Sequence, residues 1–272
     1  MNSTLRLFRP VNAVMAVLGT FISSLVAIGT SIESHIELIA IASLVVFFVL
    51  TGGNVMNDVL DSETDKVNHP ERPIPSGKIS RGQGKAIYVS SFALSVIVAF
   101  IFLNIFAVLV VIMADILLIV YETKGKYMGL PGNIIISLLI GAIFLFGGII
   151  FLKPERTILL MALASMSNLS RELIKDVEDM KGDVDRMTFP KKYGAKAALN
   201  LSSAMIVSTI LVSFLPYLAG LFTYPYLLAV SVCDLSFGLT LIFQYKNARQ
   251  GQNFSKISMV LGLISFTVGG IF

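Results

Sequence analysis

Charged residues are scarce in this sequence. Only 14% of the 272 residues are Asp, Glu, Lys or Arg, whereas 55% are hydrophobic, and the mean hydropathy is +0.82. A typical soluble domain carries about 25% charged residues. Because so few charges cannot cover the surface of a water-soluble chain of this size, the composition excludes an ordinary soluble domain. It predicts an integral membrane protein.

Cysteine and histidine are almost absent as well. The chain has one cysteine, Cys233, and two histidines, His35 and His69. One cysteine excludes an internal disulfide framework, and without CxxC or HxxxH spacing a zinc or iron–sulfur site is not expected. A bound metal would therefore need oxygen ligands, which favours Mg²⁺ or a similar hard cation.

Long apolar segments are abundant. A transmembrane helix needs roughly 20 mostly apolar residues. Segments near that length lie at 11–30, 36–56, 86–103, 105–121, 133–152, 157–173, 200–219, 224–243 and 255–272. The boundary near Asn104 is weak and the last segment is short, so the sequence supports seven to nine spans. The predicted fold is an all-α bundle of about nine transmembrane helices around a central cavity.

The basic residues predict the orientation of this bundle. If the N-terminus is cytoplasmic and the segments alternate, only Lys153 and Arg156 among the 21 lysines and arginines lie outside the cytoplasmic segments. Such an excess is typical of the cytoplasmic side of membrane proteins. It predicts a multi-pass cell-membrane protein with cytoplasmic active-site loops, in contact with membrane lipid. It also explains the net charge of +4 without a nucleic-acid partner, and no motif indicates an obligatory protein partner.

Two groups of aspartates have the same spacing, three residues and then four. The first aspartate motif consists of Asp58, Asp61 and Asp65, and the second of Asp176, Asp179 and Asp183. These steps keep the side chains of each motif on one face of a helix. Asn54 precedes the first motif by four residues and shares its face, as Glu172 does for the second.

Carboxylates at this spacing favour a bound cation. They repel one another by about a few tenths of a kcal/mol per pair in water, and more strongly near a membrane, where less solvent screens them. Mg²⁺ typically binds about one or two carboxylates and completes its shell with water and phosphate oxygens. Two facing motifs could hold roughly two or three Mg²⁺ ions around a diphosphate. Two solvated acidic loops are the alternative.

The two motifs also lie at corresponding places in the chain. Each ends an apolar segment, opens a basic loop and is followed by a proline and a glycine, in RPIPSG at 72–77 and FPKKYG at 189–194. The offset between the motifs is 118 residues throughout. A single domain over residues 1–272, built by internal duplication, is therefore predicted.

Together the motifs resemble the UbiA superfamily of membrane prenyltransferases. The NDxxDxxxD pattern of that family is matched by Asn57 and the first aspartate motif, and its DxxxD pattern by Asp179 and Asp183. RPIPSG and the YETKGK at 121–126 are also typical of it. Within the superfamily, RELIKDVEDMKGD and the GLPGN at 129–133 are most similar to archaeal digeranylgeranylglyceryl phosphate synthases.

This resemblance implies a reaction. A geranylgeranyl group would pass from geranylgeranyl diphosphate to the hydroxyl of a prenylated glycerol phosphate, geranylgeranylglyceryl phosphate, and form the second ether bond of archaeal membrane lipids. Mg²⁺ would assist departure of the diphosphate. Prenyl transfer to an aromatic acceptor, of the 4-hydroxybenzoate or quinone type, is the alternative. A cation or phosphate transporter is a more distant one, since its carboxylates would lie near helix centres.

The resemblance also implies roles for individual residues. Both aspartate motifs are expected to bind Mg²⁺ and to be catalytic. Polar and basic side chains expected near the donor diphosphate are Asn54, Asn57, Arg72, Tyr121, Lys124 and Lys126. An acceptor phosphate needs a second basic cluster, for which the candidates are Arg171, Lys175, Arg9 and Asn12.

Two further carboxylates, Asp115 and Asp234, lie inside apolar segments. A carboxylate is costly there and is a functional candidate by default. The alternative for both is a hydrogen bond to a neighbouring helix.

Overall fold

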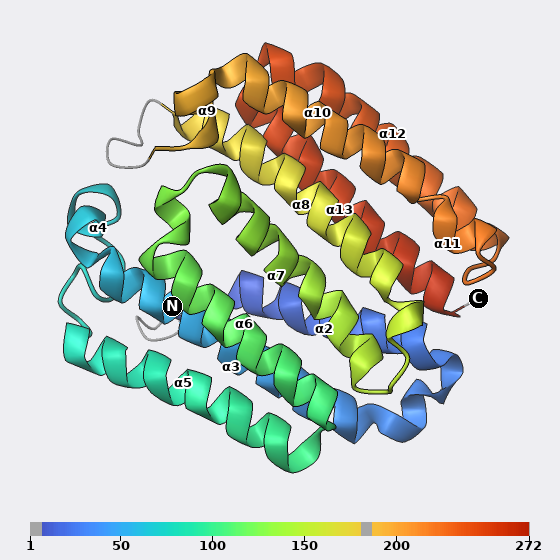
Figure 1. Ribbon diagram of the computed structural model, residues 1–272, viewed down its shortest axis with the longest axis horizontal. Coiled ribbons are helices and arrows are strands. Elements are labelled where there is room, and N and C mark those ends of the chain that lie inside the picture. Colours follow the sequence, from blue (N-terminus) through green and yellow to red (C-terminus); the bar gives the residue numbers. More distant parts are fainter. Residues whose placement is uncertain (1–6, 181–186, 272) are drawn as a thin grey trace. The chain divides into compact units, whose positions relative to one another are not determined.

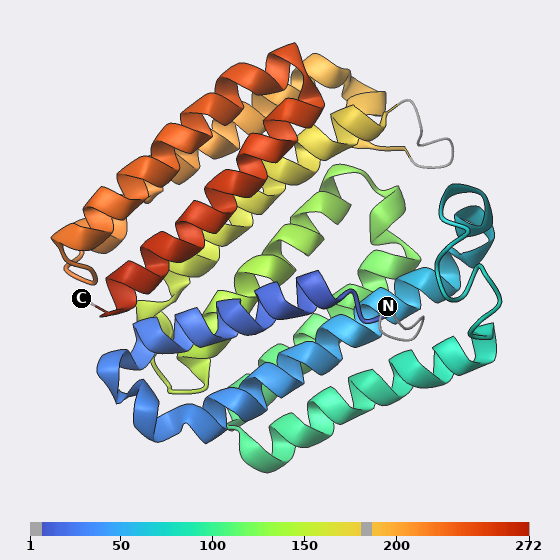
Figure 2. The same cartoon turned by 180° about the vertical axis from the view of Figure 1, so that it is seen from behind.

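The computed structural model describes residues 7–180 and 187–271, which form helices and the turns that join them. The long helices are α2 (Pro10–Ile28), α3 (Ile36–Leu60), α5 (Arg81–Phe102), α6 (Ile105–Thr123), α7 (Leu130–Ile149), α8 (Ile158–Asp179), α10 (Ala195–Val212), α12 (Tyr224–Lys246) and α13 (Ala248–Ile271). Short helical pieces connect them: η1 (Gly29–His35), α4 (Ser62–Asn68), η2 (Gly125–Tyr127), η3 (Pro154–Arg156), α9 (Phe189–Tyr193) and α11 (Leu215–Leu218). Figures 1 and 2 show these elements from opposite sides.

The helices agree with the apolar segments of the sequence. Each predicted segment overlaps one long helix, so the all-α fold is confirmed. The boundary near Asn104 is real, since α5 ends at Phe102 and α6 begins at Ile105. Asn104 caps α6, because its Oδ1 accepts a hydrogen bond of 3.0 Å from the Ala107 amide.

The number of membrane spans lies at the lower end of the predicted range of seven to nine. By length and hydropathy, seven helical stretches within the described residues qualify as spans. One of them, Pro10–Leu60, contains both α2 and α3, because η1 continues the helical path between them. Helix α8 does not qualify, since Arg171, Glu172 and Lys175 interrupt its apolar run. The multi-pass membrane character is thus confirmed, whereas a count of nine spans is not.

Large apolar side chains remain exposed along the spans, which agrees with a membrane environment. Phe100 is 71% exposed, Leu235 74% and Leu211 67%. Such surfaces on a protein in water would promote aggregation, whereas hydrocarbon solvates them.

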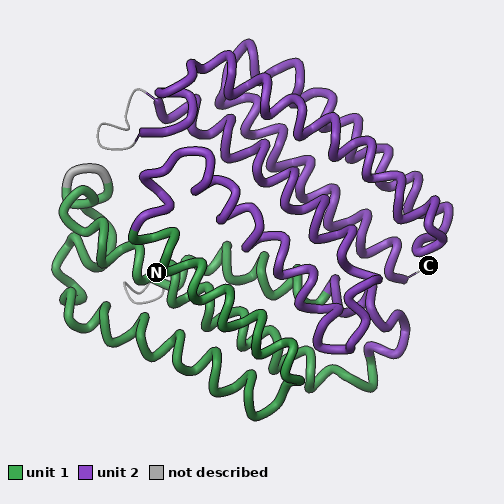
Figure 3. The backbone as a smooth tube through the Cα atoms, viewed as in Figure 1, with its two compact units in different colours: residues 1–21, 33–123 green, residues 22–32, 124–272 purple. Residues whose placement is uncertain are grey.

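Two compact units make up the chain (Figure 3). The first unit comprises residues 1–21 and 33–123, and in it α3 packs against both α5 and α6. Small residues of α3 permit this approach. A Cβ added to Gly53 would lie 3.1 Å from the Leu118 side chain of α6, and one added to Gly52 would meet the Phe92 ring of α5.

The second unit comprises residues 22–32 and 124–272. Its helix α8 contacts α7, α10 and α13, and α12 runs beside α13 in both views (Figures 1 and 2). Phe144, Leu160 and Tyr226 belong to its apolar core. Polar side chains add interhelical hydrogen bonds, for example from Ser202 Oγ to the buried Gln244 Oε1 at 2.9 Å.

The two carboxylates inside apolar helices both accept hydrogen bonds from a neighbouring element. Ser95 of α5 donates to Asp115 Oδ2 at 2.9 Å, and Ser213, which follows α10, donates to Asp234 Oδ2 at 2.8 Å. A polar partner of this kind lowers the cost of burying a carboxylate in a membrane-spanning helix. The interhelical hydrogen bond is therefore the alternative that the structure supports for both residues.

Candidate active site

The first aspartate motif lies where α3 gives way to α4. Helix α3 ends at Leu60 and α4 begins at Ser62, so Asp61 occupies the junction. The Asp61 amide donates to the Asn57 carbonyl at 2.9 Å, and the Asp65 amide donates to the Asp61 carbonyl at 2.8 Å. Helical hydrogen bonding thus continues through the junction. The three aspartates therefore follow one another by single helical turns, from the end of α3 into the start of α4.

Two arginines neutralise the outer aspartates of this motif. Arg9 Nη2 lies 2.7 Å from Asp58 Oδ1. Arg72 Nη1 lies 2.5 Å from Asp65 Oδ2 and 3.6 Å from Asp58 Oδ1. The side chains of Asp58 and Asp65 are only 3% and 8% exposed, so their charged forms need such partners. Arg72, which the family resemblance assigned to the donor diphosphate, thus lies against the first aspartate motif.

Arg9 reaches the motif from the turn before α2. Its φ of +45° is a left-handed conformation, which costs a residue with a Cβ roughly 1–2 kcal/mol. The amides of Asn12 and Ala13 donate to the Arg9 carbonyl at 2.9 and 3.2 Å, so the strained residue also begins the helix. Arg9 and Asn12 were expected from the sequence to bind the acceptor phosphate. In the structure Arg9 contacts the first aspartate motif, and Asn12 is exposed in the first turn of α2.

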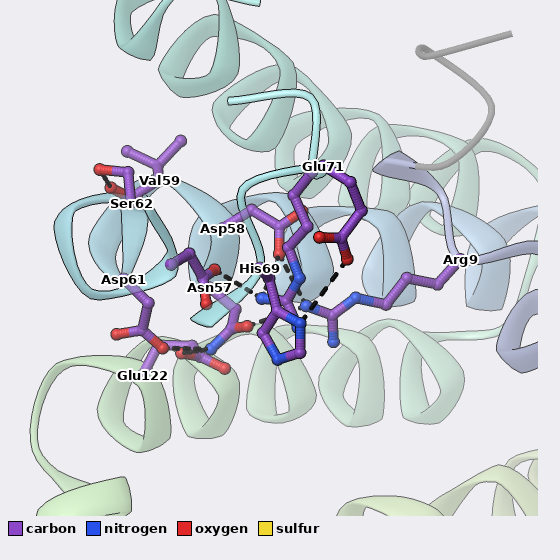
Figure 4. A network of polar contacts seen from close by, with 11 residues as sticks. Arg9, Asn57, Asp58, Val59, Asp61, Ser62, His69, Glu71 and Glu122 are labelled. Carbon is purple, nitrogen blue, oxygen red and sulfur yellow. Dashed lines mark hydrogen bonds and ion pairs between the residues drawn. The ribbon is translucent and has the colours of Figure 1, made fainter. Parts of the chain in front are cut away.

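The middle aspartate turns toward an amide. Asn57 Nδ2 donates to Asp61 Oδ2 at 3.0 Å and to Glu122 Oε2 at 2.9 Å. Figure 4 shows Asp61 and Glu122 on one side of Asn57, with Asp58 and Arg9 on the other. Asn57 Oδ1 accepts a hydrogen bond of 2.9 Å from Arg9 Nη2. Asn57 therefore joins the aspartate motif to two elements distant in the sequence.

Glu122 was not among the candidates from the sequence. It lies in the last turn of α6, is 6% exposed and directly follows Tyr121. The available signal was a carboxylate at the end of an apolar helix, inside the YETKGK segment. That signal alone does not predict a site residue, because it does not indicate which face of α6 meets α3.

The other candidates for the donor diphosphate occupy varied positions. Asn54 lies one turn before the motif, and its Nδ2 is buried with no hydrogen-bond partner in the described part of the chain. Tyr121 is partly buried in the last turn of α6. Lys124 is exposed, whereas Lys126 is buried with its Nζ 5.5 Å from the centroid of the Tyr127 ring. Both lysines belong to the second unit.

The second aspartate motif lies at the C-terminal end of α8. Asp176 Oδ2 accepts a hydrogen bond of 2.8 Å from Asn133 Nδ2, whereas Asp179 is exposed as the last residue of the helix. Asp183 lies outside the described residues. Asn133 stands in the first turn of α7, after Gly129 with φ of +68°. In the sequence, the GLPGN segment was informative only as a family resemblance and did not indicate that this asparagine contacts the motif.

Arg171 and Lys175 share one carboxylate, Glu172, which is 8% exposed. Arg171 pairs with Glu172 and also donates to Asn168 Oδ1 at 3.3 Å. Lys175 Nζ lies 3.8 Å from Glu172 Oε2. The structure thus brings the two predicted cations together on α8. An anionic ligand at these cations would compete with Glu172 for them.

The carboxylates of the site suit Mg²⁺ only if water and phosphate oxygens complete its coordination. Within residues 7–180 and 187–271 no group of three or more His, Cys, Asp or Glu side chains could hold a metal ion. Carboxylate oxygens of Asp61 and Glu122, both in the first unit, nevertheless meet at one amide. Mg²⁺ typically takes about one or two carboxylates and fills its shell with water and phosphate. These residues therefore fit Mg²⁺ bound with a diphosphate rather than in an all-protein cage.

Comparison with known proteins identifies the family. Residues 16–264 match the UbiA prenyltransferase family. The chain belongs to this family. It is therefore an enzyme, a prenyltransferase, and the family resemblance found in the sequence is confirmed.

Relatives of this UbiA-family chain match it over nearly its whole length. It is 36% identical to the digeranylgeranylglyceryl phosphate synthase of Methanococcus aeolicus, over 98% of this chain and 97% of that relative. A solved structure of digeranylgeranylglyceryl phosphate synthase in membranes has a TM-score of 0.86 and 34% identity, covering 99% of this chain and 98% of the other. A UbiA homolog from Archaeoglobus fulgidus bound to GPP and Mg²⁺ has a TM-score of 0.65 and 16% identity, over 98% and 100% of the two chains. At that identity the likeness concerns the fold.

Proposed function

We propose that this UbiA-family prenyltransferase transfers a geranylgeranyl group from geranylgeranyl diphosphate to the hydroxyl of geranylgeranylglyceryl phosphate. The observation that carries this proposal is the 36% identity, over 98% of the chain, to a digeranylgeranylglyceryl phosphate synthase. A product with two geranylgeranyl groups on one glyceryl phosphate requires a geranylgeranyl donor and a singly prenylated acceptor. The paired arginines and carboxylates of the first aspartate motif suit a donor that carries a diphosphate.

The proposed reaction replaces a phosphate ester bond by an ether bond. The C1–O bond of the donor breaks, and the diphosphate leaves with the electron pair. The acceptor hydroxyl oxygen bonds to C1, and its proton passes to a carboxylate of the site or to the released diphosphate. Negative charge develops on the leaving diphosphate, so groups that bind this charge lower the barrier. Mg²⁺, when bound, supplies positive charge to the diphosphate oxygens.

The first unit would bind the donor diphosphate. We propose that Asp58, Asp61 and Asp65 hold Mg²⁺ and that Arg72 contacts diphosphate oxygens, because a guanidinium binds phosphate in a fixed geometry. Arg72 already lies against Asp58 and Asp65, which supports this assignment. The other side chains of this unit proposed to bind the diphosphate are Asn54, Asn57 and Tyr121. Lys124 and Lys126 are proposed as well, although they belong to the second unit.

The second unit would supply more carboxylates and bind the acceptor. We propose that Asp176, Asp179 and Asp183 also hold Mg²⁺. Arg171 and Lys175 would bind the acceptor phosphate. Arg9 and Asn12, the further candidates from the sequence, belong instead to the first unit, where Arg9 pairs with Asp58. The common partner Glu172 keeps the two cations of α8 side by side, which supports their joint use for a dianion.

Activity assays with a panel of acceptors test the proposed function. Purified protein would be incubated with geranylgeranyl diphosphate, Mg²⁺ and either geranylgeranylglyceryl phosphate or 4-hydroxybenzoate, and the products would be identified by mass. We expect a doubly prenylated glycerol phosphate and release of diphosphate. A prenylated aromatic product, formed in preference, would replace the glycerol phosphate assignment with the quinone-type alternative.

We also propose that the N-terminus and both aspartate motifs face the cytoplasm of the cell membrane. The positions of lysine and arginine support this orientation. Thr64 in α4 and Ser34 in η1 are both exposed, so cysteines introduced there in a Cys233→Ala background are accessible to reagents. We expect a membrane-impermeant thiol reagent to label Thr64→Cys and Ser34→Cys from opposite sides. Labelling of both from one side would contradict the orientation.

A further inference from the structure

The last turn of α6 presents a buried carboxylate to the first aspartate motif. Glu122 is 6% exposed, and its Oε2 accepts a hydrogen bond of 2.9 Å from Asn57 Nδ2. The other hydrogen of the same amide goes to Asp61 Oδ2 at 3.0 Å. A side-chain amide has only two hydrogens to donate. Carboxylates therefore bind the entire donor end of Asn57 (Figure 4).

The acceptor end of this amide is also bound. Asn57 Oδ1 accepts from Arg9 Nη2 at 2.9 Å, and the same nitrogen lies 2.7 Å from Asp58 Oδ1. A flipped amide would turn its nitrogen toward the guanidinium and its oxygen toward two carboxylates. Both contacts would then be repulsive. The surrounding charges therefore select one orientation of Asn57.

The two carboxylates that bind Asn57 differ in burial and in the helix that carries them. Asp61 lies at the α3–α4 junction and is partly exposed, whereas Glu122 is buried on a continuous helix. Helix α6 packs tightly on α3 one turn earlier, where a Cβ added to Gly53 would lie 3.1 Å from the Leu118 side chain. Gly53 and Leu118 each precede the hydrogen-bonded residue of their helix by four positions, and so share its face. Helix packing thus sets the distance between Glu122 and Asn57.

We infer that Glu122 is a positioning residue of the active site, which holds the Asn57 amide so that Asn57 orients Arg9 and Asp61. The inference rests on the proposed function, since it concerns the site proposed to bind the prenyl diphosphate with Mg²⁺. Glu122 acts in this role as a hydrogen-bond acceptor through Asn57. Its loss removes one of the three contacts that fix the Asn57 amide and weakens binding of the donor.

A double-mutant cycle on the full-length enzyme tests this role. Glu122→Ala is expected to lower kcat/KM for geranylgeranyl diphosphate by about 10- to 100-fold, the effect of losing one charge-assisted hydrogen bond. Glu122→Gln keeps an acceptor oxygen and is expected to stay within about fivefold of the wild type. The variant with both Asn57→Ala and Glu122→Ala is expected within about twofold of Asn57→Ala alone, because Glu122 acts through Asn57.

Thermal unfolding gives a readout that does not depend on turnover. Geranylgeranyl diphosphate with Mg²⁺ should raise the Tm of the wild type and of Glu122→Gln, and raise that of Glu122→Ala less, because a ligand stabilises the state that binds it. Asp115→Asn is the matched control. Asp115 is also a carboxylate of α6, 6% exposed and hydrogen-bonded to another helix, but its partner is Ser95. Its replacement is expected to change kcat/KM by less than about twofold.

Several results would overturn the positioning role. These are full activity of Glu122→Ala, equal losses in Glu122→Ala and Glu122→Gln, or independent losses that multiply in the double variant. Should Glu122→Ala fail to fold, Glu122→Met takes its place, since it keeps the length of the side chain and lacks a carboxylate. An absence of Mg²⁺-dependent prenyl transfer by the wild type would overturn the proposed function instead.

Discussion

The two aspartate motifs share one spacing but have different surroundings. In the first motif, Arg9 and Arg72 pair directly with aspartates, and both come from outside the helix that carries the motif. In the second motif, Asp176 accepts from the amide of Asn133 in α7. The nearby cations of α8 pair with Glu172, which precedes the motif. Among the described residues, two motifs of equal spacing thus have different partners, and the neighbouring elements determine what each carboxylate can bind.

The largest expected effect tests whether both motifs serve one reaction. Asp61→Ala and Asp179→Ala should each lower kcat by about 100- to 1000-fold, because each removes a negative charge proposed to hold Mg²⁺ at the leaving group. Removal of divalent metal by EDTA should abolish turnover, and added Mg²⁺ should restore it. Prenyl transfer from the labelled donor provides the measurement. Full turnover in EDTA, or in either variant, would contradict the magnesium–diphosphate assignment.

A smaller effect is expected from replacing Arg72, the arginine that pairs with Asp65 of the first motif. Arg72→Ala should raise KM for geranylgeranyl diphosphate by about 10- to 100-fold, since charge-assisted hydrogen bonds contribute about 1.5–3 kcal/mol. Arg72→Lys should recover part of this loss, because lysine keeps the charge but lacks the planar fork of the guanidinium. Steady-state kinetics with the acceptor saturating provide the measurement. An unchanged KM in Arg72→Ala would remove Arg72 from the donor site.

Replacement of Arg171 or Lys175 on α8 should affect KM for the acceptor rather than KM for the donor. Arg171→Ala and Lys175→Ala should raise KM for geranylgeranylglyceryl phosphate by about 10-fold or more, with a smaller change for the donor. The reason is that a phosphate dianion needs cations apart from those that bind the diphosphate. Steady-state kinetics in which each substrate is varied separately test the difference. Impaired donor binding alone would assign both residues to the diphosphate site.

The smallest effect is expected beside the first motif rather than within it. Glu63 lies in α4 next to Ser62, is exposed, and pairs with Lys66 at 2.9 Å and Arg81 at 2.8 Å. The hydrogen bond from Lys66 lowers the pKa of Glu63, so its contribution to stability is present at neutral pH and is lost as the pH falls. Solvent screens such a pair, so Glu63→Gln should leave both kcat/KM and Tm at neutral pH nearly unchanged. A marked loss of activity would extend the site along α4.

The helices and the carboxylates could be predicted because their signals are local. An apolar run of spanning length forms a helix whatever surrounds it, and steps of three and four residues define one helical face. Arg72 could be associated with the site because RPIPSG, which follows the first motif closely in the chain, is typical of the family; Arg72 is seven positions after Asp65. The number of spans was less predictable, since a continuous helical path joins α2 to α3 and charges interrupt α8.

Contacts between distant residues could not be predicted from the sequence. Glu122 is separated from Asn57 by 65 positions, and Arg9 by 48. Asn133 and Asp176 lie 43 positions apart. No periodicity within one helix specifies which face of another helix it will meet, because that depends on the packing of both.

The sequence by itself determined an all-helical membrane protein of the UbiA family with two matched aspartate motifs, because composition, run length and residue spacing are properties of the chain alone. Tertiary structure decided which groups surround those motifs. It turned the strained Arg9 onto Asp58, set Glu122 against Asn57 and placed Asn133 beside Asp176. These contacts depend on the close approach of separate helices. Small residues permit that approach, for example Gly53, which has no Cβ.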